Sequence, residues 1–235
     1  MGLFDLLKPG GDATGDARAA LDAAADPSVD QTAVTRLVER LLAIGIDGAA
    51  AYPSARSVAE SALADAGGDR EQAVNKIIRH HVVTGGIGGV ATSAGGFVTM
   101  PVALPVNIVE FYVQAARMVA AVATVRGYDA TDGTIRTAVL LTMLGSNADE
   151  MLAKAGITTG GGRLATLAAG RLPRSAMMII NKAVGFRLLR TVGEGTAGRL
   201  GRAVPVVGGA VGGAIDGYMM HRIARQALTE FPRRQ

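Results

Sequence analysis

Residues 82–125 read VVTGGIGGVATSAGGFVTMPVALPVNIVEFYVQAARMVAAVATV. The run from Val82 to Val109 carries no charged residue and contains six glycines. It lacks the alternation of polar and apolar positions that marks a half-buried strand, so a helical interpretation is favoured. Pro101 and Pro105 divide the run, and Pro105 suits the first turn of a helix that continues to Val125. We therefore expect a glycine-rich apolar helical hairpin.

Helices are also expected on both sides of this hairpin. No segment of the chain shows an alternating strand pattern. The predicted fold class is therefore all-α, a compact multi-helix domain of about eight helices. We assign residues 1–15 to an apolar N-terminal arm with a flexible joint and residues 16–235 to a single helical domain. The expected helices span residues 28–44, 54–66, 69 onward, 105–125, 132–145, 147–155, 163–169, 172–192 and 206–231.

The composition favours close packing of helix backbones. Hydrophobic residues make up 49% of the chain but aromatic residues only 4%, and there are 32 glycines. Cysteine is absent, which excludes disulfides and thiolate metal sites.

The charge is distributed unevenly along the sequence. Residues 1–70 carry 6 Lys/Arg against 11 Asp/Glu, whereas residues 161–235 carry 12 Lys/Arg against 3 Asp/Glu. The basic end can face anionic lipid or pair with the acidic end, and the lack of aromatic stacking partners disfavours nucleic acid.

The apolar run is nearly long enough to span a bilayer, which takes about 20 apolar residues. Its glycines weaken that interpretation, and Glu110 and Arg117 would each cost about 2–3 kcal/mol at a bilayer centre. We favour a hairpin buried in the protein core and leave insertion into lipid open. The start of the chain, Met1 to Asp5, has no basic segment before an apolar one, so we expect no secretory signal and a cytoplasmic location.

Several motifs follow one another along this chain: His80, Gly85-Gly86, Gly95-Gly96-Phe97-Val98-Thr99-Met100-Pro101, Leu104-Pro105, Gly127-Tyr128-Asp129 and Val204-Pro205-Val206-Val207-Gly208-Gly209 through Phe231. In this order they resemble the EcsC family. The family often has Asp before its Leu-Pro pair, where this chain has Ala103, so no role of that carboxylate carries over. The resemblance implies a membrane context and proteins encoded beside ABC transporters, and it implies no reaction.

One polar stripe follows the apolar helix that ends at Val125. Asn107, Glu110, Gln114 and Arg117 recur at helical spacing and so share one side. We hypothesise that this side lines a polar groove or a lipid headgroup pocket, with Arg117 as the anion contact and Glu110 as its counter-charge. The alternative is a solvated or internally paired helix face, which is what most charge stripes are.

Two further sets of residues point to packing and membrane contact. The small-residue spacing that permits close helix contact recurs at Gly85 and Gly89 and again at Gly209, Gly213 and Gly217. In the N-terminal arm, Leu3, Phe4 and Leu7 can share one face, as in a short interfacial anchor, or can dock against the protein itself.

No catalytic or metal-binding motif is found, so we predict no catalytic residue, no metal and no cofactor. The favoured function is a membrane-associated protein at the inner face of the membrane, which binds lipid or an apolar ligand and assists a transport or cell-envelope process. Transporter components and a second copy of the chain are the expected protein partners. Two alternatives remain: an enzyme with a site near His80, Glu110 and Asp129, and an oligomeric scaffold.

Overall fold

The computed structural model describes residues 31–49, 52–94, 96–144 and 205–234. Within these residues there is no strand, although Ala49 and Tyr52 form an isolated bridge. The described part of the chain is therefore all-α, which confirms that part of the predicted fold class. Its helices are α2 (Gln31–Asp47), α3 (Ala55–Asp65), α4 (Arg70–Ala94), α5 (Gly96–Val125), α6 (Gly133–Leu144) and α10 (Pro205–Glu230).

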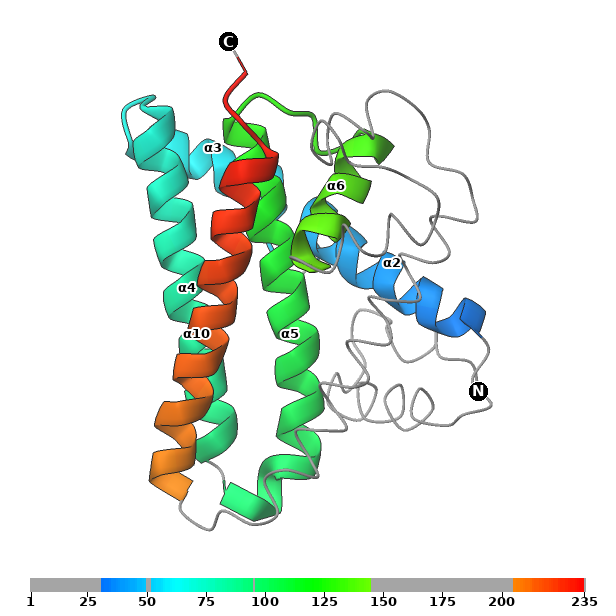
Figure 1. Ribbon diagram of the computed structural model, residues 1–235, viewed down its shortest axis with the longest axis vertical. Coiled ribbons are helices and arrows are strands. Elements are labelled where there is room, and N and C mark those ends of the chain that lie inside the picture. The colour runs from blue at the N-terminus through cyan, green and yellow to red at the C-terminus, as the bar shows by residue number, and fades with distance from the viewer. Residues whose placement is uncertain (1–30, 50–51, 95, 145–204, 235) are drawn as a thin grey trace.

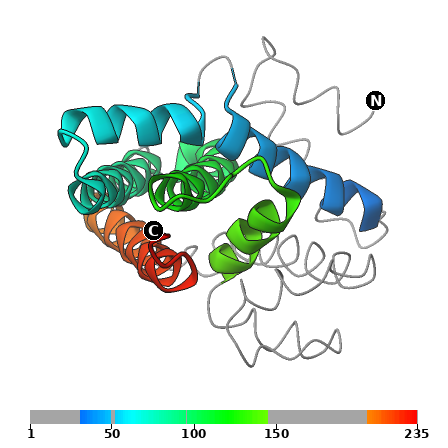
Figure 2. The same ribbon diagram turned by 90° about the horizontal axis from the view of Figure 1, so that it is seen from above.

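Helix α5 lies at the centre of the bundle and contacts α2, α3, α4, α6 and α10. Helices α4 and α10 lie side by side on one flank of α5, while α2 and α6 lie on the other (Figures 1 and 2). The α4 and α10 pair is antiparallel, because α10 begins at the end of the bundle where α4 finishes (Figure 1). Segments far apart in the sequence thus build one flank of the molecule.

Local capping explains where several helices begin and end. The Ser54 hydroxyl accepts a hydrogen bond from the Ser57 amide at 3.1 Å and so caps α3. Asp69 Oδ1 accepts hydrogen bonds from the amides of Glu71 and Gln72 at 2.9 and 3.0 Å at the start of α4. Gly127, with φ of +92°, turns the chain after α5, where a side chain would be strained. Helices α3 and α4 thus begin within one residue of the predicted starts at residues 54 and 69.

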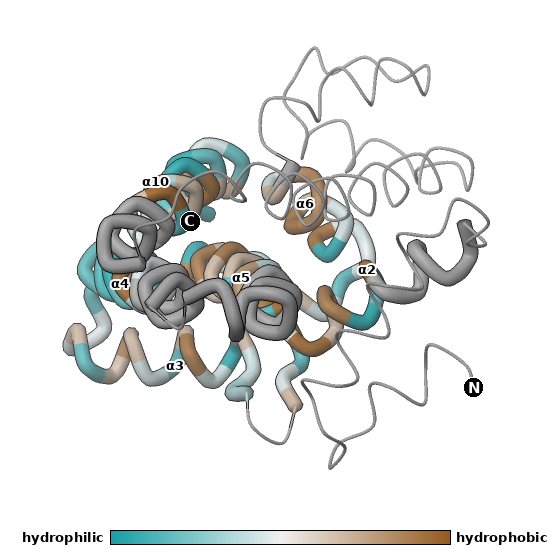
Figure 3. The backbone as a smooth tube through the Cα atoms, turned by 90° about the horizontal axis from the view of Figure 1, so that it is seen from below, coloured by the Kyte–Doolittle hydropathy of each residue, from teal (hydrophilic) through white to brown (hydrophobic). Residues whose placement is uncertain are grey.

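The core is made mostly of small side chains on α5. Ala115, Ala116, Ala120 and Ala121 are fully buried, and Met118 and valines fill the remaining volume. At Gly45 of α2, a β-carbon would lie 2.7 Å from that of Ala116, so only glycine permits this approach of α2 to α5. Figure 3 shows hydrophobic segments of α5, α6 and α10 where these helices face one another. Close backbone packing therefore accounts for the Ala-rich and Gly-rich composition of the described helices.

Glycines also bring α4 and α10 together. A β-carbon at Gly86 would lie 3.2 Å from the carbonyl oxygen of Gly213, and one at Gly217 would lie 3.9 Å from Gly86 Cα. Gly85 instead faces the side chain of Met220, 3.3 Å from its terminal methyl group. Of the predicted packing glycines, Gly213 and Gly217 thus meet α4: Gly213 lies against Gly86, and Gly217 lies against Val82 and Gly86. The side-chain environments of Gly89 and Gly209 lie outside the description.

The prediction that a helix starts at Pro105 is wrong. Helix α5 runs from Gly96 through Pro101 and Pro105 without interruption to Val125. Proline removes one backbone donor and displaces the carbonyl one turn earlier, which can kink a packed helix instead of ending it. Figure 1 shows the first turns of α5 at an angle to the rest of the helix.

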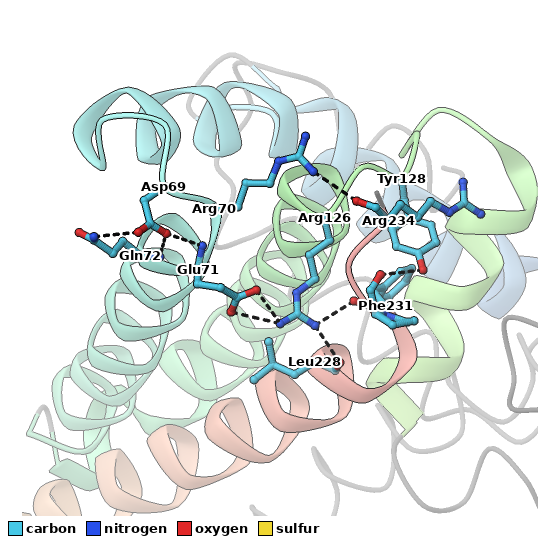
Figure 4. A network of polar contacts seen from close by, with 10 residues as sticks. Asp69, Arg70, Glu71, Gln72, Arg126, Tyr128, Leu228, Phe231 and Arg234 are labelled. Atoms are coloured by element: carbon cyan, nitrogen blue, oxygen red, sulfur yellow. Dashed lines mark hydrogen bonds and ion pairs between the residues drawn. The ribbon is translucent and has the colours of Figure 1, made fainter.

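Beyond α10, residues 231–234 are fastened to the end of α5 (Figure 4). Arg126 Nη1 donates to the carbonyl oxygens of Leu228 and Phe231, both at 2.9 Å, which caps the C-terminus of α10. The Tyr128 hydroxyl donates to the Pro232 carbonyl at 2.9 Å, and the Tyr128 ring packs edge-on against Phe231. Arg234 places its guanidinium 4.1 Å from the centre of the Tyr128 ring. This network joins α5 to α10 and stabilises the fold.

Several predictions fall outside the described residues. They are the arm and joint at residues 1–15 with Leu3, Phe4 and Leu7, and the helices at 147–155, 163–169 and 172–192. Inside the described residues, α6 and α10 begin and end within one residue of the predicted ranges.

Candidate functional site

The polar stripe of α5 forms a short hydrogen-bond chain with α4. Gln114 Nε2 donates to Glu110 Oε1 at 3.0 Å, one turn earlier on α5. The Thr84 hydroxyl of α4 lies 3.0 Å from Gln114 Oε1. The structure thus brings together two of the four predicted stripe residues and adds a third group from α4. The side chain of Asn107 is outside the described residues.

A single proton on Thr84 is shared among competing acceptors. Besides Gln114 Oε1, the hydroxyl lies 2.9 Å from the carbonyl oxygen of His80 and 3.3 Å from that of His81. Because a hydroxyl donates one hydrogen bond at a time, Gln114 Oε1 is free to accept from another donor whenever Thr84 turns to its own helix. The chain of polar groups can therefore rearrange locally without moving the backbone.

Arg117 is a buried cation without an ion pair among the described residues. The residue is only 8% exposed, and Nη1 is buried with no hydrogen-bond partner. The guanidinium carbon lies 5.5 Å from the centre of the Tyr52 ring, which is a cation–π contact. None of the ion pairs between described side chains includes Arg117. Burial lowers the pKa of Arg117, and the neighbouring Tyr52 and Glu110 oppose that shift.

Such an arrangement is unusual because buried polar groups are nearly always paired. A buried donor left without an acceptor costs about 1–3 kcal/mol, and more for a charged group. An anionic oxygen near Nη1 would supply the missing acceptor and neutralise the charge. The chemistry that Arg117 favours is therefore binding of a carboxylate or phosphate group.

His81 lies next to this cation and stays neutral. It is 2% exposed, and its Nδ1 is 2.8 Å from the Ile77 carbonyl oxygen, so Nδ1 carries the proton and donates. Burial lowers the pKa of His81 to about 4, and the charges of Arg117 and His80 add to that effect against the hydrogen bond to Ile77. At neutral pH the buried imidazole therefore adds no positive charge beside Arg117.

Tyr52 completes the surroundings of Arg117 from the turn between α2 and α3. Its pKa is raised, first by burial and then by Glu110, while Arg117 acts in the opposite direction. The phenol therefore remains protonated at neutral pH and can donate a hydrogen bond. Tyr52 thus places its ring beside the guanidinium, and Glu110 limits the net positive charge around Arg117.

The structure separates the residues of the alternative enzyme site. Glu110 lies on α5, which continues for another 15 residues to Val125, or about 22 Å at 1.5 Å per residue, before Asp129. Asp129 Oδ1 instead accepts from the amide and hydroxyl of Thr131, at 2.9 and 2.7 Å. His80 is exposed on α4 and packs edge-on against His81. These three residues do not form one site.

Sequence reasoning missed Tyr52, His81 and Thr84. His81 follows the buried residues Val74 and Ile77 at helical spacing, so this periodicity could have placed it on the buried face of α4. Tyr52 stands in a turn, where no periodicity predicts a neighbour. Thr84 contacts α5 only because of the way α4 and α5 pack.

In the part of the chain that the structure describes, no group of three or more His, Asp or Glu side chains could hold a metal ion. Nor does any described helix combine the length and hydropathy needed to cross a bilayer. The protein is thus a helical bundle with a buried arginine, Arg117, whose Nη1 lacks a hydrogen-bond partner. Comparison with protein-family models, with curated proteins and with solved structures finds no match.

Proposed function

We propose that the protein is a peripheral membrane protein that binds an anionic lipid, with Arg117 as the contact for the acidic group and Glu110 as its counter-charge. The observation that carries this proposal is the buried Nη1 of Arg117, which has no hydrogen-bond partner. A carboxylate or phosphate oxygen would satisfy it and would neutralise the charge of the guanidinium.

An amphiphile fits this site better than a small soluble anion. Next to Glu110, the sequence from Val82 to Val109 is uncharged, and its backbone forms the C-terminal part of α4 and the N-terminal part of α5. An acyl chain lying along these helices would have apolar neighbours while its acidic group meets Arg117. The charge of Arg117 then selects lipids with an acidic headgroup over neutral ones.

The wider proposal follows the resemblance to the EcsC family. It comprises a helical domain of about eight helices, in which α4 and α5 form a glycine-rich apolar hairpin. The protein would act at the cytoplasmic face of the membrane, as an accessory to a transport or cell-envelope process, with transporter components or a second copy of itself as partners. The acidic first part and the basic last part of the sequence support an association with charged surfaces.

Vesicle flotation with the full chain tests the proposal. Vesicles of phosphatidylcholine with 30% phosphatidylserine are expected to carry the wild-type protein, and vesicles of phosphatidylcholine alone are expected to carry less. Arg117→Ala should weaken the difference, whereas Arg56→Ala, which removes an exposed arginine on α3, should not. Native mass spectrometry of the gently purified protein would show any lipid that remains bound. Equal flotation of wild type and Arg117→Ala would remove Arg117 from the lipid site.

A further inference from the structure

Exposed apolar side chains gather on the paired helices α4 and α10. The large hydrophobic residues with the highest exposure in the described chain are Val83 at 54%, Ile215 at 47% and Tyr218 at 63%. Val83 is on α4 and the other two are on α10, three residues apart and so on one face. A β-carbon at Gly217 would lie 3.6 Å from the Val82 carbonyl, which places Val83 and Tyr218 at the same height of the pair.

Basic side chains lie about one turn away from Val83 and Tyr218 on α4 and α10. Arg79 and His80 precede Val83 on α4, and Arg222 and Arg225 follow Tyr218 on α10, all of them exposed. None of the ion pairs between described side chains includes these arginines. Moreover, neither residues 72–83 nor residues 217–229 include an acidic residue. These turns therefore carry a net positive charge.

The order of charge along the bundle is also informative. The C-terminal part of α4, the N-terminal part of α5 and the N-terminal part of α10 lie at the same end of the molecule (Figure 1). The sequence has no charged residue in 82–109 or in 203–215, which covers these three helix ends. From that end, the order is therefore an uncharged segment, then the partly buried Asp216, then exposed Tyr218 and Val83, and then the arginines. Acyl chains, interfacial aromatic residues and headgroup phosphates follow the same order at a bilayer surface.

We propose that the outer face of α4 and α10, defined by Arg79, Val83, Tyr218, Arg222 and Arg225, docks onto an anionic phospholipid bilayer with the uncharged end of the bundle toward the acyl chains. This inference rests on the proposed membrane function and adds the surface and its orientation. The positive charge favours a surface rich in anionic headgroups, and the apolar side chains favour shallow insertion. A nucleic acid fits less well, because Tyr218 is the sole aromatic ring among these five residues.

A single tryptophan at the centre of this face reports docking directly. The chain has no tryptophan, so Tyr218→Trp introduces the only one, at an exposed position. Vesicles with 30% phosphatidylserine are expected to shift its emission to shorter wavelength, and brominated acyl chains should quench it. Ser61→Trp places the reporter on an exposed position of α3 and should show neither effect. An unchanged emission spectrum of the Tyr218→Trp variant, under conditions where the wild type floats, would overturn the proposed docking face.

Affinity provides the second measurement. Each basic residue near an anionic surface contributes about fivefold to partitioning, so Arg222→Gln with Arg225→Gln should weaken vesicle binding by about 25-fold. The control combines Arg40→Gln with Arg56→Gln, which changes net charge equally on α2 and α3 and should alter binding by less than about fivefold.

The outcomes separate the two proposals. If the wild type binds no anionic vesicle, the membrane function and the docking face both fail. If it binds but the Arg222 and Arg225 variant binds equally well, the docking face alone fails. If the tryptophan of the Tyr218→Trp variant is already blue-shifted in a vesicle-free dimer, as measured by light scattering, this face belongs to a second copy of the chain and lipid docking is overturned.

Discussion

Replacing Arg117 with methionine should stabilise the lipid-free protein by about 1 kcal/mol. The buried Nη1 without a partner costs about 1–3 kcal/mol in the native state, and methionine removes that cost while filling much of the same space. Loss of the cation–π contact with Tyr52 lowers the stability by about 1 kcal/mol. Attraction to Glu110 is a smaller loss, because the two groups form no ion pair.

Urea unfolding followed by far-ultraviolet circular dichroism measures this difference in the free energy of unfolding. For a domain of this size, 1 kcal/mol corresponds to about 2–4 °C in the melting temperature. In the same measurement, an anionic lipid should raise the free energy of unfolding of the wild type but not that of Arg117→Met, because a ligand stabilises only the state that binds it. A more stable variant that no longer responds to lipid is the signature of a binding residue maintained at a cost to stability.

The reasoning would be refuted by a loss of stability. If Arg117→Met destabilises the lipid-free protein by more than about 1 kcal/mol, the guanidinium is satisfied within the native protein and no anion is needed. Arg56→Met serves as the control, because its side chain is 76% exposed and its change should stay within about 0.5 kcal/mol.

Further predictions concern the packing, the cap and the buried histidine. Gly217→Ala should be more stable than Gly86→Ala by about 1 kcal/mol in urea unfolding, because a β-carbon meets its nearest atom at 3.6 Å in the first and at 3.2 Å from a backbone carbonyl in the second. Arg126→Gln should lose about 2 kcal/mol and speed amide hydrogen exchange at the end of α10, since two carbonyl oxygens lose their donor. The pKa of His81 near 4 lies below its ordinary value of 6.5, so the folded protein takes up this proton less readily than the unfolded chain. The stability from neutral His81 should be complete above about pH 6.5 and should decline as the pH falls toward 4. Between pH 7 and pH 5 the loss should be about 2 kcal/mol, as urea unfolding of the wild type and of His81→Gln at these two pH values would show.

Each of these predictions has an opposing result. Equal stability of the two alanine variants would show that α4 and α10 adjust freely at the glycine contact. Unaltered exchange in Arg126→Gln would mean that α10 is capped without this side chain. A wild type and a His81→Gln variant with the same pH dependence would show that other groups dominate acid destabilisation.

The sequence predicted best those features that depend on neighbouring residues. Ser54 and Asp69 cap α3 and α4 through groups two or three residues away, and Gly127 turns the chain after α5. Such contacts are written into local sequence, so the helix ends could be placed before the structure. Prolines 101 and 105 were misjudged because a local rule disfavours proline inside a helix, whereas α5 continues through both of them.

The candidate site was predictable only in part for the same reason. Helical spacing placed Glu110, Gln114 and Arg117 on one side of a helix, and the structure shows the bond between the first two. Whether Arg117 is solvated or buried depends on Tyr52 and α4, which are distant in the sequence. The contact of Gly86 with Gly213 likewise depends on the pairing of two helices that the sequence separates widely.

The antiparallel pairing of α4 with α10 sets the order in which the molecule can fold. Helix α10 follows α4, α5, α6 and residues 145–204, so synthesis delivers its partner late. Until then, the glycines of α4 that contact α10 lack their partner helix. Folding therefore requires the closure of a long-range contact, which is intrinsically slow.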